Sequence, residues 1–237
     1  MLFTNFNLRD FYELARIKYP LLANIIRRVH FGLIINNTKK RISGKGNEIN
    51  YKYSILSAVK ININGNNNII DIEPECIIKG LSIIIIGDNH RIKIGRECKI
   101  NRGGLFRLVD ADGELKVGNK TTIESAHIAI TEQGSKIEIG DDCMLAYDID
   151  IRTGDSHAIF DSKTNERINY AKDVLIRDHV WIAAHCFILK GVLIPSNSIV
   201  ATGSVVTKTF SQEGEGIILA GNPAKIVKTG IIWMRDR

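Results

Sequence analysis

The sequence predicts a mainly β protein: a solenoid of short strands wound from six-residue repeats, with a helical extension before it and a short segment after it. Three observations support this prediction. Isoleucine supplies 41 of the 237 residues, roughly twice its ordinary usage, and β-branched side chains favour strands. Aliphatic residues also recur at every sixth position over a long stretch. Neither the period of a helix nor the alternation of a hairpin strand produces that spacing.

Residues 1–40 are predicted to be helical and basic. Apolar side chains between Phe11 and Val29 recur at mixed helical spacing. Pro20 divides them into two segments, because proline disfavours the helical conformation in the residue before it. We assign residues 1–57 to an N-terminal helical or irregular extension. Its amphipathic character favours packing against the main domain or a neighbouring subunit, with peripheral contact between residues 1–40 and a membrane as the alternative.

The solenoid is predicted to span residues 58–228, with residues 229–237 as a C-terminal tail. The first position of each unit is aliphatic, and the position four residues later is small or modest in size. We expect the aliphatic side chains to stack inside the coil and the small ones to lie near its tight corners. The most regular aliphatic series is Ile176, Ile182, Ile188, Ile194, Val200 and Val206.

All four cysteines occupy the small position of a unit, four residues after an aliphatic residue. The sequence has neither a Cys-x-x-Cys pair nor a Cys/His pair at the spacing of zinc ligands. We therefore expect reduced thiols that pack the core and take no part in metal binding or catalysis. The four are Cys76, Cys98, Cys143 and Cys186.

Composition narrows the class of protein. With 44% hydrophobic and 24% charged residues the chain is not expected to be disordered. The net charge of +6 suits anionic ligands, but the basic residues are scattered and no nucleic-acid-binding motif is present. The N-terminus does not resemble a signal peptide, and the apolar runs are too short to span a bilayer. These features predict a cytoplasmic protein, with the inner face of the membrane as an alternative location.

Three motifs accompany the repeat. Ile151-Arg-Thr-Gly-Asp-Ser-His157 ends a coil, and Val180-Trp-Ile182 opens the next regular one. Gly203-Ser-Val-Val-Thr-Lys208 is followed by Ala220-Gly-Asn-Pro-Ala-Lys225. Repeat and motifs together resemble the left-handed β-helix, or hexapeptide-repeat, acyltransferases over roughly residues 58–228. Within that superfamily they are most similar to the maltose/galactoside and bacterial polysaccharide O-acetyltransferases. The resemblance implies a left-handed parallel β-helix.

His157 is the predicted general base. A sugar hydroxyl is a weak nucleophile, and a base within hydrogen-bond reach must take its proton as it attacks a thioester carbonyl. Histidine suits this role because its unperturbed pKa lies near 6.5. The repeat breaks directly after His157, and residues 158–173 form a polar insertion that fits neither repeat nor helix. A polar insertion beside a base is typical of a binding flap.

Two further residues are candidates for the catalytic site. Asp155 lies two residues before His157, where a carboxylate can orient the imidazole, although in some members of the family a backbone carbonyl does this. His127 lies 30 residues before His157, close to the position at which the family has a polar residue that contacts the reacting acetyl oxygen. It is a candidate for assisting the oxyanion, with a surface or interface histidine as the alternative.

The resemblance also implies acetyl-CoA as co-substrate, with no metal. A tryptophan would line the acetyl and pantetheine end of the donor site while also packing at an interface. Two lysines would meet the phosphates, and small side chains would leave room for the pantetheine arm. Ala183 departs from the family, which more often has glycine there, and we expect the change to be tolerated. The predicted donor-binding residues are Trp181, Ala183, Ala201, Gly203, Lys208 and Lys225.

The predicted function is therefore an acetyl-CoA-dependent O-acetyltransferase acting on a bacterial surface saccharide of capsule or lipopolysaccharide type. The family resemblance implies a homotrimer with active sites between neighbouring solenoids. N-acetylation of an amino sugar or nucleotide sugar is the alternative within the class. Outside it, His179 and His185 lie six residues apart and keep open a zinc carbonic-anhydrase-like site, and a non-catalytic solenoid is a further alternative.

Overall fold

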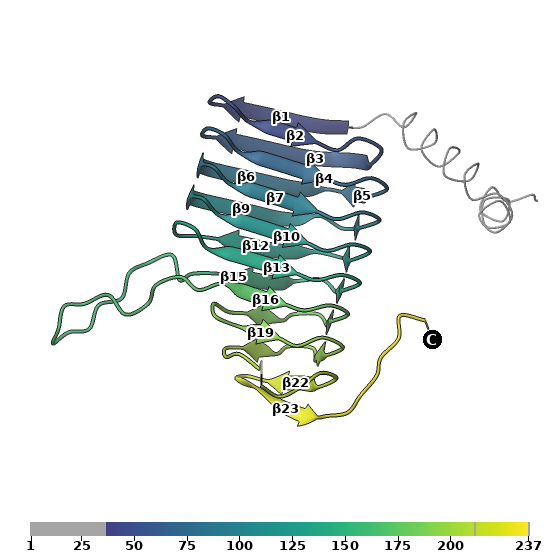
Figure 1. Ribbon diagram of the computed structural model, residues 1–237, viewed down its shortest axis with the longest axis vertical. Coiled ribbons are helices and arrows are strands. Elements are labelled where there is room, and N and C mark those ends of the chain that lie inside the picture. Colours follow the sequence, from purple (N-terminus) through teal and green to yellow (C-terminus); the bar gives the residue numbers. More distant parts are fainter. Residues whose placement is uncertain (1–36, 211, 237) are drawn as a thin grey trace, which may run out of the picture.

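A computed structural model describes residues 37–210 and 212–236. Within these ranges every regular element is a β-strand, and the strands stack into a parallel solenoid (Figure 1). The predicted fold class is thereby confirmed. The helical prediction for residues 1–40 falls mostly on residues 1–36, which lie outside the described residues, and it is wrong for residues 37–40, which belong to strand β1 (Asn37–Ser43).

Each full coil contributes one strand to each of three faces, which we number in chain order. Face 1 is a seven-stranded parallel sheet. Its strands are β2 (Glu48–Asn50), β4 (Ile69–Ile72), β7 (Arg91–Ile94), β10 (Glu114–Val117), β13 (Lys136–Ile139), β16 (Val174–Ile176) and β19 (Leu193–Ile194).

Faces 2 and 3 belong to one sixteen-stranded sheet and meet in the long strand β3 (Ile55–Asn64). The other strands of face 2 are β5 (Ile77–Lys79), β8 (Lys99–Ile100), β11 (Thr122–Ile123), β14 (Met144–Leu145), β17 (Trp181–Ile182), β20 (Ile199–Val200) and β22 (Ile218–Gly221). Those of face 3 are β6 (Leu81–Asp88), β9 (Gly104–Ala111), β12 (Ala126–Ile130), β15 (Ile149–Arg152), β18 (Phe187–Ile188) and β21 (Val205–Val206).

The two ends of the solenoid carry one extra strand each. β1 (Asn37–Ser43) pairs in parallel with β3, and β23 (Ala224–Lys228) pairs antiparallel with β22. The faces are joined by three corners: corner 1/2 leads from face 1 to face 2, corner 2/3 leads on to face 3, and corner 3/1 leads into the next coil. These corners fix where each candidate site residue lies.

The six-residue series predicts the core correctly. Ile176 and Ile194 pair on face 1, Ile182 and Val200 pair on face 2, and Ile188 pairs with Val206 on face 3. All six side chains are buried. One coil here is therefore three six-residue units, each supplying one aliphatic side chain to a continuous column inside the solenoid.

The structure confirms that the cysteines pack the core. All four thiols are free and buried in the same core. Burial raises the pKa of Cys143 to about 12, so its sulfur stays a protonated thiol. A buried protonated thiol fits a packing role and not that of a nucleophile.

The solenoid starts earlier than the repeat indicates. The repeat places its first coil at residue 58, whereas β1 and β2 already form coil between Asn37 and Asn50. Residues 37–57 therefore belong to the solenoid and not to the extension. β1 has a single aliphatic side chain, Ile42, which is in register with the buried Ile63 but is 47% exposed, so one aliphatic residue among six polar ones does not reveal the strand. Among the described residues no helix is long and apolar enough to cross a membrane.

Candidate active site

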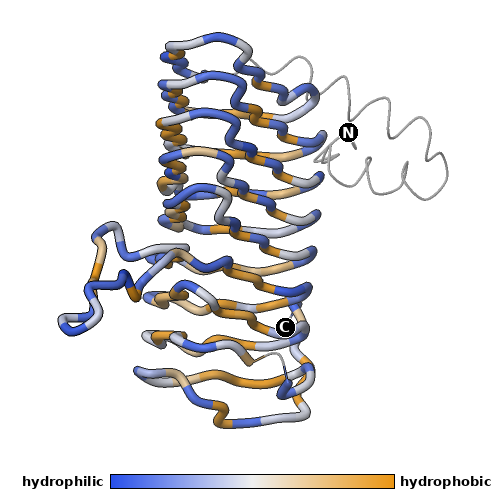
Figure 2. The backbone as a smooth tube through the Cα atoms, turned by 60° about the vertical axis from the view of Figure 1, so that its left-hand side comes forward, coloured by the Kyte–Doolittle hydropathy of each residue, from blue (hydrophilic) through white to orange (hydrophobic). Residues whose placement is uncertain are grey.

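His157 lies on corner 3/1, five residues after β15 ends at Arg152. It stands at the root of the loop formed by residues 153–173, which projects away from the solenoid (Figures 1 and 2). The imidazole is exposed, and it makes no hydrogen bond to any other residue in the described part of the chain. Its ring nitrogens are therefore available to a substrate.

The side chain of Asn169 forms hydrogen bonds to residues before and after His157 in the loop. Its side chain is 7% exposed, and its Nδ2 donates to the carbonyl oxygen of His157 at 2.7 Å and to Oδ2 of Asp155 at 2.9 Å. Its Oδ1 accepts from the backbone N–H of Ile159 at 2.7 Å. One buried amide thus holds the backbone around the predicted base. The sequence showed only a polar residue in a polar insertion, which gave no signal for this role.

Asp155 has other partners than the imidazole of His157. Its carboxylate pairs with Lys190, whose Nζ also donates to the carbonyl oxygen of Asn169 at 2.9 Å. Partial burial opposes ionisation, but the hydrogen bonds from Lys190 and Asn169 lower the pKa of Asp155 below its usual range. The structure thus places Asp155 where it fixes the loop, and only through the loop does it act on His157.

His127 belongs to a separate cluster on face 3. Its Nδ1 lies 2.9 Å from Oδ2 of Asp150, and Arg152 donates to the same carboxylate through Nε at 2.7 Å and Nη2 at 2.6 Å. Burial of Asp150 opposes ionisation, but the bonds from His127 and Arg152 lower its pKa to about 2. His127 lies near the start of face 3 and His157 beyond its end, so one chain does not bring the two histidines together.

A cleft of about 330 Å³ opens beside His157. Ser156 and Ala158, the two neighbours of His157 in the chain, both line it. Arg167 pairs with Glu132, whereas Arg107 is exposed and forms no ion pair with any described residue. The cleft therefore offers a free cation near the predicted base. Its lining is Arg107, Val109, Asp110, Thr131, Glu132, Ser156, Ala158 and Arg167.

Most predicted donor-binding residues come together elsewhere, on face 2. Trp181 opens β17 and pairs with Ile199 of β20, so that Ala183 lies directly over Ala201 at the turn into corner 2/3. Gly203 follows on the same corner with φ of +73° and open space beside its Cα. This strip of small side chains leaves backbone accessible next to an indole, which fits a pantetheine arm.

The two lysines lie apart from each other. Lys225, on β23, is the register partner of Ala220 on β22. β22 in turn pairs with β20, the strand directly before Ala201. Lys208 follows β21 and lies on corner 3/1, the same corner as His157. Both are exposed. The structure therefore groups His157 with Lys208, and Trp181, Ala183, Ala201 and Gly203 with Lys225.

The pair considered for zinc does not form one site. His179 lies on corner 1/2, with Nδ1 2.7 Å from Oδ2 of Asp142. His185 lies on corner 2/3, with Nδ1 2.6 Å from Oδ2 of Asp148. Across residues 37–210 and 212–236, no group of three or more His, Cys, Asp or Glu side chains is arranged to hold a metal ion.

Comparison with known proteins shows where this arrangement recurs. No model of a known protein family matches the chain. The chain is 39% identical to the polysialic acid O-acetyltransferase of Neisseria meningitidis over 193 residues, 81% of this chain and 87% of that protein. Among solved structures, the polysialic acid O-acetyltransferase OatWY is 38% identical with a TM-score of 0.79, covering 84% of this chain and 92% of the other. The polySia-specific acetyltransferase NeuO is 34% identical with a TM-score of 0.73, covering 84% and 89%.

A parallel solenoid of six-residue units that shares this much sequence with known acetyltransferases is itself an acetyltransferase of the hexapeptide-repeat class, as the motifs predicted. Within that class the identity extends over most of both chains. The chain belongs to the family of the polysialic acid O-acetyltransferases.

Proposed function

We propose that this enzyme transfers the acetyl group of acetyl-CoA to a hydroxyl group of an anionic capsule polysaccharide, with His157 as general base. The observation that supports this most directly is the exposed, unpaired imidazole at the root of the loop, beside a cleft that contains an unpaired arginine. The relatives act on polysialic acid, a polymer with one carboxylate per sugar.

The chemistry assigned to His157 is proton transfer. Its imidazole takes the proton of the sugar hydroxyl as the oxygen attacks the thioester carbonyl, and returns a proton to the leaving sulfur when the tetrahedral intermediate collapses. The acetyl group passes directly between the substrates, because the cysteines are buried in the core. Asn169 holds the backbone carbonyl of His157, which keeps the ring in place during the transfer.

The acceptor would lie in the cleft on corner 3/1. Arg107 presents a free guanidinium there, and a guanidinium binds a carboxylate in a bidentate manner. Arg167 pairs with Glu132, and its guanidinium carbon lies 4.7 Å from the centre of the Tyr170 ring. Tyr170 itself is an exposed aromatic side chain on the loop. Charged and aromatic groups of this kind suit an anionic sugar polymer.

The donor would lie along face 2. Trp181 would contact the acetyl and pantetheine end, and Lys225 would meet a phosphate at the far end of the strip of small residues. Since face 3 separates His157 on corner 3/1 from this strip on face 2 and corner 2/3, we assign each active site to two copies of the chain. One copy supplies His157 and Lys208, and its neighbour supplies Trp181 and Lys225. A closed trimer provides three equivalent sites of this kind.

Acetyl-CoA is expected to stabilise the purified enzyme. A ligand at 100 times its Kd raises the free energy of unfolding by about 2.7 kcal/mol, which thermal unfolding detects. The companion assay measures release of free thiol with acetyl-CoA and either polysialic acid or a neutral polymer such as dextran. We expect thiol release with the anionic polymer alone. An unchanged melting temperature at millimolar acetyl-CoA contradicts the donor assignment, and release with dextran but not polysialic acid contradicts the acceptor assignment.

A shared active site predicts complementation between two inactive variants. His157→Ala and Trp181→Ala are co-expressed with different affinity tags, and mixed oligomers are isolated by two successive purifications. In a mixed trimer of either composition, one site in three contains an intact His157 facing an intact Trp181. The purified mixed oligomers should thus recover roughly a third of wild-type activity. If each copy formed its own site, the mixture would be as inactive as its components.

A further inference from the structure

The last residues of the described chain fold back onto the solenoid. After β23 ends at Lys228, the chain turns at Gly230, whose φ is +67°. Ile231 then donates its N–H to the carbonyl oxygen of Gly216 at 3.0 Å. A Cβ on Gly216 would lie 2.6 Å from the carbonyl oxygen of Ile231, so the close approach requires glycine. We call residues 230–235 the C-terminal strap; Figure 1 shows it in yellow beside the coils.

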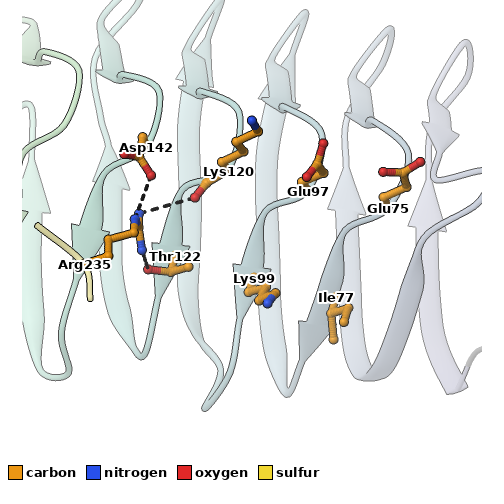
Figure 3. A pocket seen from close by; sticks show the side chains of 8 residues that line it. All are labelled: Glu75, Ile77, Glu97, Lys99, Lys120, Thr122, Asp142 and Arg235. Atoms are coloured by element: carbon orange, nitrogen blue, oxygen red, sulfur yellow. Dashed lines mark hydrogen bonds and ion pairs between the residues drawn. The ribbon is translucent and has the colours of Figure 1, made fainter. Parts of the chain in front are cut away.

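The strap presents alternate side chains to the coils. Trp233 is 7% exposed, whereas its neighbours Ile232 and Met234 are 90% and 75% exposed. Arg235 points inward again. Its Nε donates to Oδ1 of Asp142 at 2.7 Å and its Nη1 to Oγ1 of Thr122 at 3.0 Å (Figure 3). Its Nη2 donates to the carbonyl oxygen of Cys143 at 2.6 Å. One guanidinium thus fastens the end of the strap to two successive coils.

Trp233 is held by reciprocal hydrogen bonds with His179 on corner 1/2. Its Nε1 donates to the carbonyl oxygen of His179 at 2.9 Å, and Nε2 of His179 lies 3.1 Å from the carbonyl oxygen of Trp233. The two rings stack with centroids 3.9 Å apart and planes 9° apart. Asp142 faces Nδ1 of the same imidazole. The imidazole of His179 is thus fixed between the carboxylate of Asp142 and the carbonyl oxygen of Trp233.

This arrangement places the strap beside Trp181. The indole rings of Trp181 and Trp233 lie with centroids 6.1 Å apart and planes at 47°, within the range of favourable aromatic pairs. The register partners of Trp181 on face 2 are Met144 and Ile199, two flexible or aliphatic side chains. Trp233 therefore supplies a rigid aromatic wall next to an indole that is half-buried on a flat sheet.

We propose that Trp233 is a positioning residue of the donor site: through its stack on His179 it fixes the orientation of Trp181 for binding acetyl-CoA. This inference rests on the donor role of Trp181 in the proposed function. The strap continues directly from β23, which carries Lys225, so one C-terminal unit connects the two ends of the proposed donor site. Donor binding then depends on a segment that lies outside the six-residue repeat.

The test compares Trp233→Ala and Trp233→Phe in the full chain, with Met234→Ala as the matched control from the exposed side of the strap. The sequence contains two tryptophans, so both Trp233 variants leave Trp181 as the only indole. We expect Trp233→Ala to weaken acetyl-CoA binding roughly threefold to tenfold, the range of one aromatic pair. The KM for the polymer should stay unchanged. Phenylalanine should restore most of the donor affinity, and Met234→Ala should match the wild type.

Fluorescence anisotropy of Trp181 reports how freely its indole rotates and should be lower in Trp233→Ala than in Trp233→Phe. Wild-type donor affinity in Trp233→Ala, measured well below its melting temperature, would mean that Trp233 only stabilises the C-terminus and would overturn the proposal. If Trp181→Ala loses donor binding and Trp233→Ala does not, the donor site stands and the positioning role falls. A wild-type enzyme that does not bind acetyl-CoA overturns the donor site and the positioning role together.

Discussion

Replacing His157 with alanine is expected to lower the turnover number by roughly 10²- to 10⁴-fold, the usual contribution of a general base. The physical reason is that the hydroxyl must lose its proton as it attacks, and no other described group at this corner combines exposure with a neutral nitrogen base. The side chain is exposed and unpaired within the described chain, so its loss should leave the melting temperature unchanged. Acetyl-CoA affinity should also be retained, because the donor strip lies on face 2.

A matched control is His185→Ala, because that imidazole is also solvent-exposed but lies on corner 2/3 and pairs with Asp148. We expect its turnover number to stay within about twofold of the wild type, because His185 lines neither the acceptor cleft nor the corner that carries the predicted base. Steady-state thiol release, calorimetric acetyl-CoA binding and thermal unfolding are measured for both variants. Near-wild-type turnover in His157→Ala would remove the general base from this corner and leave the cleft without a catalytic group.

The regular part of the solenoid was predictable because aliphatic residues at every sixth position fill its core. The series that begins at Ile176 falls on the three faces in turn, and the buried thiol of Cys186 falls at the small position. The start of the solenoid was not predictable, because this six-residue pattern is absent from its first strand. β1 lies at the end of the described stack with most of its side chains exposed, and Ile42 is its single aliphatic residue, so no six-residue spacing marks Asn37–Ser43.

The candidate site was predictable only in part. His157 and Trp181 belong to short motifs within otherwise regular coils, so the sequence identified both. The placement of His157 on corner 3/1 and of Trp181 on face 2 depends on how the loop of residues 153–173 interrupts the count of six, and only the folded coil shows it. Asn169 and Trp233 were not identified as site residues at all. Each acts through contacts between segments far apart in the chain, and no spacing rule marks such contacts.

Among the described glycines, Gly87 is the one at which adding a methyl group should lower the free energy of unfolding most. It is the second-last residue of β6, next to corner 3/1, with φ of +123°, and a Cβ there would lie 1.7 Å from the carbonyl oxygen of Asp110 in the next coil. Gly65 stands above it with φ of +153° and a Cβ position 1.9 Å from the carbonyl oxygen of Gly87. The backbones of successive coils therefore touch along this corner, where no side chain can yield. Backbone strain and overpacking together should cost Gly87→Ala about 4 kcal/mol.

Gly134 offers the matched control, because its φ is +73° but no atom lies within 4 Å of its Cβ position. Gly134→Ala should therefore lose only about 1 kcal/mol, from strain alone. Denaturant unfolding compares the two, and amide exchange maps the damage. Because each coil contacts only its neighbours, exchange in Gly87→Ala should rise in β1 to β9 while β18 to β22 keep wild-type protection. Equal losses in the two variants would mean that the coils can separate at this corner, and that close backbone contact is not what sets their spacing.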